Sequence, residues 1–191
     1  MVPKEKINYI SEHFSYEVSE MMYAGQFWLS LITHKKEFKN TFTYDVFRNM
    51  IIDHLLLHAR NLLEFFYYKG DEDKYAKPDF YARSWETPEK TPQISILEKR
   101  VNSEITHLGL SRLDVTVEEK PWELAKLVNE LLQISEQFLD KLEPEYYNEL
   151  LKILRSEIKK CYIKIDMIEG RPAYIFNYDF LGKLVDDVAQ T

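Results

Sequence analysis

Glycine, proline and cysteine are all scarce in this chain of 191 residues, which has five glycines, seven prolines and one cysteine, Cys161. A single cysteine excludes an intramolecular disulfide and a zinc site built only from cysteines of this chain. The sequence also lacks a glycine-rich phosphate loop, a GxSxG elbow and the protein-kinase motifs, which disfavours ATP-driven and serine-hydrolase chemistry. Cys161 lacks neighbours that would activate a nucleophile, so we expect a buried thiol there.

Long apolar runs and an excess of positive charge are absent as well. No apolar run approaches the roughly 18 residues that a membrane span needs, and the N-terminal segment MVPKEKINYISEHF carries charges where a signal peptide needs an apolar core. The net charge of −7 argues against a broad electrostatic footprint for DNA or for anionic lipid. We expect a soluble, cytoplasmic protein with no cofactor and no membrane partner.

What the sequence does contain is helical periodicity, because apolar residues recur at three- and four-residue spacing. The pattern predicts helices over about 7–34, 43–68, 93 to 107 or 110, 122–142 and 144–165. A proline-rich segment at about 70–92 indicates a long irregular loop, with Phe80 and Trp85 as its buried anchors. The fold class is therefore an all-α bundle of four to five main helices, a single domain over 1–170, with an aromatic-rich tail over 171–191 packed on it.

The second of these helices holds most of the polar candidates. Its apolar positions cover most of the circumference, which predicts a central helix. Arg60 and Glu64 are spaced to form an ion pair on its narrow polar stripe. His54, His58 and Asn61 instead share a face with apolar residues, so we expect them to be partly buried and hydrogen bonded.

His54 and His58 stand four residues apart and can bind one metal ion from a single helix. The HExxH arrangement is absent, so further ligands would come from His107, Glu104, His13 or a distant carboxylate. In the alternative interpretation both imidazoles form hydrogen bonds in the core, to a neighbouring amide or to tyrosine hydroxyls. Because most buried histidines bind no metal, the sequence favours this second interpretation, and folding is expected to need no metal.

The segment RVNSEITHLGLSR, residues 100–112, places Arg100, Glu104 and His107 on one flank of the third helix. Arg100 and His107 are two turns, or about 10 Å, apart and almost in phase. Cleavage of a phosphodiester needs an imidazole that moves a proton and a guanidinium that stabilises charge on phosphorus. The alternative is a surface pair between Arg100 and Glu104, with His107 near the helix end where a cation is mildly favoured.

The spacing of Arg100 and His107 resembles the arginine–histidine signature of HEPN-domain proteins, a superfamily rich in metal-independent ribonucleases. The position after the arginine is usually polar in that superfamily, whereas here it is Val101. The resemblance implies a protein that acts on RNA, with His107 as general acid/base and Arg100 as phosphate stabiliser. Glu104 is the third catalytic candidate, and a second copy across a homodimer would help to complete the site.

A longer stretch, from about Asp45 to Arg112, is similar to a family of uncharacterised bacterial helical proteins. The similarity rests on LLLHARNLLEFFYY, Asp79-Phe80, Trp85 and RVNSEITHLGLSR in this order, and it implies no activity. It implies that polar residues of the second and third helices converge beneath the loop at about 70–92. The candidate binding residues are His58, Arg60, Asn61, Asp79, Trp85, Asn102 and Arg112. They could equally form a buried polar network, as in a non-enzymatic binding or interaction protein.

The segment KILRSEIKKCYIK collects positive charge near the C-terminus. Its basic residues are Lys152, Arg155, Lys159, Lys160 and Lys164. Such a run can steer a phosphate backbone, but a charged run on a terminal helix is usually a solvated face.

The two interpretations of His107 predict different results for the substitution His107→Ala. Wild type and variant would be incubated with a mixed RNA pool in EDTA, and both RNA cleavage and melting temperature would be measured. In an active site, the substitution abolishes cleavage and leaves the melting temperature unchanged. With a structural histidine, the wild type cleaves nothing, and the substitution lowers the free energy of unfolding by about 1–3 kcal/mol because a buried partner loses its hydrogen bond.

Overall fold

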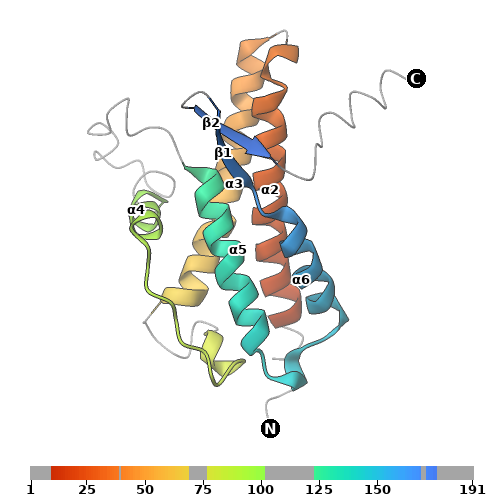
Figure 1. Ribbon diagram of the computed structural model, residues 1–191, viewed down its shortest axis with the longest axis vertical. Helices are drawn as coiled ribbons and strands as arrows, with labels where there is room; N and C mark the ends of the chain where they lie inside the picture. The colour runs from red at the N-terminus through yellow and green to blue at the C-terminus, as the bar shows by residue number, and fades with distance from the viewer. Residues whose placement is uncertain (1–9, 39, 69–76, 102–122, 169–170, 176–191) are drawn as a thin grey trace.

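A computed structural model of the chain describes residues 10–38, 40–68, 77–101, 123–168 and 171–175. Over these residues the chain forms five α-helices and one two-stranded antiparallel sheet (Figure 1). The predicted all-α bundle is therefore confirmed. Among the described helices, none combines the length and the hydropathy that a membrane span requires.

The two longest helices lie side by side as an antiparallel hairpin (Figure 1). The first, α2 (Ser15–Thr33), continues a π-helical turn, η1 (Ile10–Phe14), and a 3₁₀ turn, η2 (Lys35–Glu37), follows it. The second, α3 (Thr41–Tyr67), begins where the side chain of Asn40 accepts a hydrogen bond of 2.9 Å from the backbone N–H of Phe42. This side chain satisfies one of the free N–H groups at the start of the helix.

The central helix of the bundle is α2. It packs against α3, against α5 (Leu124–Lys141) and against α6 (Glu149–Cys161), with Val18, Met21 and Leu29 fully buried. The prediction that the helix over 43–68 is central is wrong, because only part of its apolar surface meets other helices. Its exposed apolar residues are Phe42, Val46, Phe47, Met50 and Leu57.

A glycine lets α2 and α5 approach closely. A Cβ atom added to Gly25 would lie 3.1 Å from Cγ2 of Val128 on α5, which is closer than a comfortable carbon–carbon contact.

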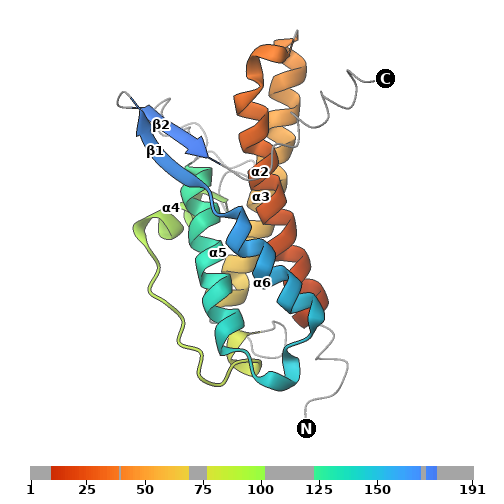
Figure 2. The ribbon, with the colours of Figure 1, turned by 45° about the vertical axis from the view of Figure 1, so that its right-hand side comes forward.

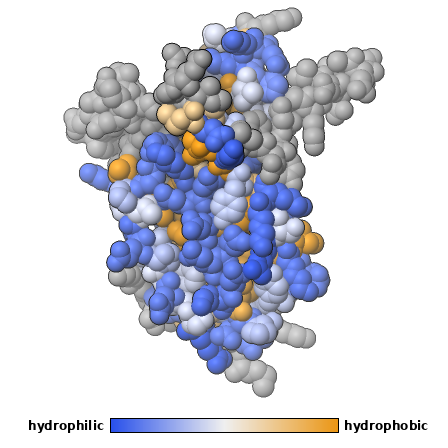
Figure 3. Space-filling view, viewed as in Figure 1, coloured by the Kyte–Doolittle hydropathy of each residue, from blue (hydrophilic) through white to orange (hydrophobic). Residues whose placement is uncertain are grey.

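The helices α5 and α6 turn their apolar sides toward the core. The face of the molecule over these two helices is therefore largely hydrophilic (Figure 3).

The chain leaves α6 as a β-hairpin and not as a longer helix. The helix expected to reach Ile165 ends at Cys161, and β1 (Lys164–Ile168) then pairs with β2 (Arg171–Ile175) in antiparallel register. The prediction overlooked the alternation of apolar and polar residues in IKIDMI, which is typical of a strand with one buried face.

The hairpin of β1 and β2 lies beside the first turns of α5 (Figure 2), and side chains of two helices contact it. The amide of Asn129 on α5 donates to the carbonyl of Ile163 at 2.7 Å, and its side-chain oxygen accepts from the N–H of Ile163 at 2.8 Å. Tyr174 in β2 packs edge-on against Trp28 of α2, with ring centroids 6.1 Å apart. These contacts pack the described residues 171–175 on the bundle. The rest of the predicted tail, 176–191, lies outside the described residues, and the division into a domain over 1–170 and a tail stays a prediction.

Residues 77–91 form an irregular segment, as expected, apart from a 3₁₀ turn, η3 (Pro78–Phe80). Trp85 is an anchor of this segment, with ring centroids 5.7 Å from Phe66 and 5.6 Å from Phe138. The prediction for Phe80 is wrong: its side chain is 47% exposed, because the turn buries Pro78 and the following Tyr81 instead.

The third predicted helix begins as α4 (Pro92–Arg100), which lies against α5. Thr91 precedes it and accepts a hydrogen bond from the N–H of Ile94 at 3.1 Å, and its hydroxyl donates to Glu130 of α5 at 2.6 Å. The predicted continuation to residue 107 or 110 lies outside the described residues.

We expect Gly25→Leu to lower the free energy of unfolding by about 1–3 kcal/mol, because the new side chain would overlap Val128 and push α2 away from α5. Urea denaturation measures the loss. The control is Gly25→Ala, whose single methyl group needs a shift of Val128 by only a few tenths of an ångström and gains helix propensity of up to about 1 kcal/mol. A leucine variant as stable as the alanine variant would contradict the close approach.

Candidate functional site

Four ionisable side chains meet where α2 packs against α3. Glu17 and Glu20 are three residues apart on α2, and His54 and His58 are four residues apart on α3. Residues at these spacings share one helix face. Because the two helices are antiparallel, Glu17 meets His58 while Glu20 meets His54.

The inner half of this cluster is a hydrogen-bonded pair. The side chain of His58 is 5% exposed, and its Nδ1 lies 2.7 Å from Oε2 of Glu17. A carboxylate that is ionised only accepts hydrogen bonds, so Nδ1–H of His58 is the donor, and in the neutral form of the imidazole the lone pair is then on Nε2. The amide of Asn61 donates to the same Oε2 at 3.0 Å, and the ring of Tyr16 packs edge-on against His58 at 5.4 Å.

The outer half of the cluster is open to solvent. His54 is 44% exposed, and its Nε2 lies 2.8 Å from Oε2 of Glu20. The rings of His54 and His58 have centroids 4.5 Å apart. Consequently Glu20, His54 and His58 each offer one ligand atom, and these three atoms lie within 4.8 Å of one another.

Two imidazole nitrogens and one carboxylate oxygen form a ligand set that suits zinc and related transition metals. Two ligands of a tetrahedral zinc ion lie about 3.3–3.5 Å apart. The three atoms lie within 4.8 Å of one another, so they would have to approach by at most about 1.5 Å to share one ion. Glu17 would then hold the ring of His58 in place through Nδ1, as carboxylates commonly do for metal-binding histidines.

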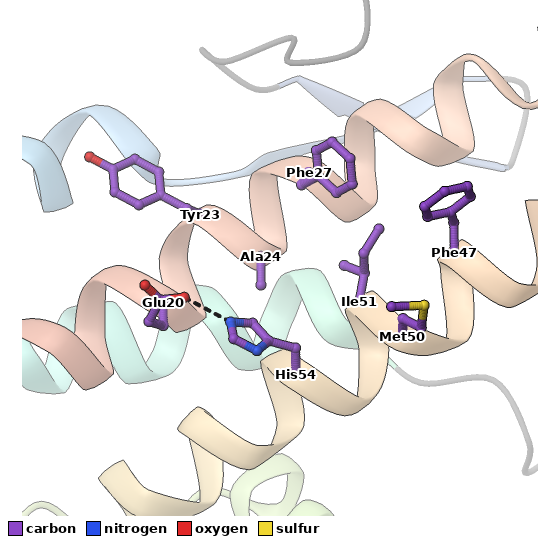
Figure 4. A pocket seen from close by; sticks show the side chains of 8 residues that line it. All are labelled: Glu20, Tyr23, Ala24, Phe27, Phe47, Met50, Ile51 and His54. Carbon is purple, nitrogen blue, oxygen red and sulfur yellow. Dashed lines mark hydrogen bonds and ion pairs between the residues drawn. The ribbon is translucent and has the colours of Figure 1, made fainter.

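A groove of about 500 Å³ runs along the seam between α2 and α3 from the outer half of the cluster. Glu20 and His54 are at one end, and the rings of Phe27 and Phe47 are at the other (Figure 4). The remaining lining residues are Tyr23, Ala24, Met50 and Ile51. Polar ligand atoms at one end of a mostly apolar groove are an arrangement typical of small-molecule sites.

The structure brings together only some of the binding residues predicted from the sequence. His58 and Asn61 share the carboxylate of Glu17, whereas Arg60 forms the predicted surface pair with Glu64 at 3.0 Å.

The loop residues predicted to join them lie elsewhere. Asp79 and Trp85 line a second groove, of about 840 Å³, that neither His58 nor Asn61 lines. Convergence of these four residues at one site is therefore not observed.

The residues of the ribonuclease hypothesis fall outside the described part of the chain. These are Glu104, His107 and the side chain of Arg100, whose backbone ends α4. The binding candidates Asn102 and Arg112 also lie outside the described residues. The RNA activity and the homodimer stay predictions.

The two glutamates were missed by sequence reasoning. Each is an ordinary polar position on a long helix, and the pairing of Glu17 with His58 and of Glu20 with His54 depends on the register between α2 and α3. A signal was present, since the two carboxylates and the two imidazoles have nearly matching spacings on consecutive helices.

The thiol of Cys161 is buried in the structure. Burial, with Glu157 as a lesser cause, raises the pKa of the Cys161 thiol to about 12, and the predicted buried thiol is confirmed.

Carboxylates offset the charge of the basic run, four of whose cations are in α6 and one at the start of β1. All five cationic side chains lie within ion-pair distance of a carboxylate. The partners of Lys152, Arg155, Lys159, Lys160 and Lys164 are Glu149, Asp140, Glu136, Glu157 and Asp166, in this order.

We expect Glu17→Ala to lower the free energy of unfolding by about 1–3 kcal/mol, because it leaves the buried Nδ1–H of His58 and the amide of Asn61 without their acceptor. The matched control is Glu20→Ala on the same helix, where an exposed pair is lost at a cost of about 0–1 kcal/mol. Urea denaturation at neutral pH compares the two. Equal losses would contradict the inner pair as the stabilising half of the cluster.

Comparison of the chain with protein-family models, with curated proteins and with solved structures finds no match. What the site does is therefore inferred from its own side chains.

Proposed function

We propose that this helical bundle binds one divalent transition-metal ion, such as Zn²⁺, through Glu20, His54 and His58. The observation that carries the proposal is the convergence of their three ligand atoms, within 4.8 Å of one another, from two helices that pack together. The sequence favoured a structural interpretation of the histidine pair; the two glutamates opposite it now favour the metal.

Preorganisation of His58 supports this function. The imidazole is buried, its Nδ1–H is donated to Glu17, and Glu17 is itself held by Asn61. A neutral imidazole whose other nitrogen is already hydrogen bonded is the form that metals bind. Because the side chain of His58 is already held in one orientation, it loses little conformational entropy when an ion binds.

The number of ligands indicates the kind of site. Structural zinc sites have four protein ligands, whereas catalytic sites have three and keep a position for water or substrate. Glu20, His54 and His58 are the one candidate metal group among the described residues, and the exposed side of His54 leaves that position accessible.

A second histidine–glutamate pair provides an internal comparison. His34 and Glu37, at the C-terminal end of α2, are in contact at 2.6 Å, but no second histidine joins them within a metal-binding group of the described residues. Like His54 and Glu20, the pair offers one imidazole and one carboxylate, but it lacks the second imidazole that His58 supplies.

The test is titration of the EDTA-treated protein with Co²⁺, followed by the visible absorption of the bound ion and by calorimetry. We expect one Co²⁺ per chain, with affinity reduced at least about tenfold in His54→Ala and in His58→Gln. The control His34→Ala should bind as the wild type does. His54 is exposed, so its loss leaves the fold intact even where His58→Gln lowers stability.

Absence of stoichiometric binding, or equal affinity of wild type and His54→Ala, would contradict the metal site and favour a structural polar network. The proposed ribonuclease activity on RNA is independent of this result, because its assay contains EDTA.

A further inference from the structure

The groove beside the cluster has one polar end and one apolar end. Figure 4 shows Glu20 and His54 facing each other at the polar end, with Ala24, Ile51 and Met50 beyond them. We infer that the groove binds an amphipathic monocarboxylate, whose carboxylate completes the coordination of the metal ion and whose hydrocarbon chain lies along the apolar walls. This inference rests on the metal-binding function proposed above.

Charge is the first argument for an anionic head group. A divalent ion bound by one glutamate, Glu20, and by two neutral imidazoles retains one unit of positive charge. The carboxylate of Glu17 is already engaged by His58 and Asn61. Glu17 keeps its negative charge behind His58, so the positive charge that a carboxylate ligand offsets is the charge on the ion and the three groups that touch it. The carboxylate also supplies an oxygen donor of the kind that such ions accept at an open position.

The walls of the groove are the argument for a hydrocarbon chain. Between the cluster and Phe47, the lining side chains of Ala24, Met50 and Ile51 offer no hydrogen-bond donor. Tyr23 directs its hydroxyl away from His54. A polar ligand body would lose hydrogen bonds to water there without replacement, whereas an apolar chain would cover Met50, which is 60% exposed.

Size agrees with a small molecule. A volume of about 500 Å³ lies within the range of ligand sites, about 300–1,000 Å³. A second copy of the chain could also cover the exposed apolar side of α3, but a helix face would make no use of the metal at the end of the groove.

The test uses decanoate with the Co²⁺-loaded protein and follows the absorption of Co²⁺ and the heat of binding. We expect decanoate to alter the Co²⁺ spectrum and to bind at least about tenfold tighter than acetate, which lacks the chain, or decanol, which lacks the charge. The variant Phe47→Ser with Met50→Ser should weaken decanoate binding at least about tenfold and leave Co²⁺ affinity unchanged. The matched control is Phe42→Ser with Val46→Ser, because these exposed residues of α3 do not line the groove.

The outcomes separate the two proposals. Failure to bind Co²⁺ overturns both. Two results would overturn the carboxylate site alone while Co²⁺ still binds. One is an affinity for decanoate no higher than for acetate and decanol, and the other is an equal loss of decanoate affinity in the two double variants. Light scattering of the same samples tests for the other occupant, a second copy of the chain. The groove would be assigned to a second copy if the wild type were a dimer that bound no decanoate and the double variant Phe47→Ser, Met50→Ser were a monomer.

Discussion

The contact between His58 and Glu17 is the constraint on which the arrangement of α2 and α3 depends. An imidazole that is 5% exposed must have a hydrogen-bond partner, because an unsatisfied polar group in the core costs more than the bond itself contributes. Glu17 supplies that partner from the central helix and also accepts from Asn61. A slip of either helix would break both bonds at once. The pair therefore selects one register from those that the apolar surfaces of the two helices would otherwise allow.

Once this register is set, helix geometry places the rest of the site. One turn away from Glu17 and His58, Glu20 and His54 necessarily face each other, since each pair of residues lies on one helix face. The groove follows from the same architecture. The first turns of α3 lie beside α2 and beyond the ends of the other described helices (Figure 2), and Phe47 and Met50 of α3 are exposed. Site and groove are thus consequences of a helical hairpin of which only one part is enclosed by α5 and α6 (Figure 2).

Much of this fold was predictable, and the failures have identifiable causes. Periodicity located the helices. The shared face of His54, His58 and apolar residues correctly indicated burial for His58, but the expected partial burial of His54 is wrong, because its side chain is 44% exposed at the outer edge of the cluster. The same reasoning wrongly made α3 the central helix, because apolar residues around most of its circumference were taken as a sign of burial. Several of these apolar side chains instead line an exposed groove. For Glu17 the sequence offered only the nearly matching spacings of two carboxylates and two imidazoles, because its partner depends on the register between two helices. The strand after Cys161 was missed because a helical period was extended across an alternating segment.

Stability alone does not account for the outer half of the cluster. The inner pair is nearly enclosed and satisfies three polar groups, so its presence follows from the cost of burying His58. His54 and Glu20 are both more than one-third exposed, and an exposed pair of this kind contributes at most about 1 kcal/mol. A buried network that served only to hold the helices would end at Asn61 and Glu17. Here it continues through His54 to the polar end of a groove of about 500 Å³. The second imidazole thus lies where the proposed metal ion would bind and not where it would support the core.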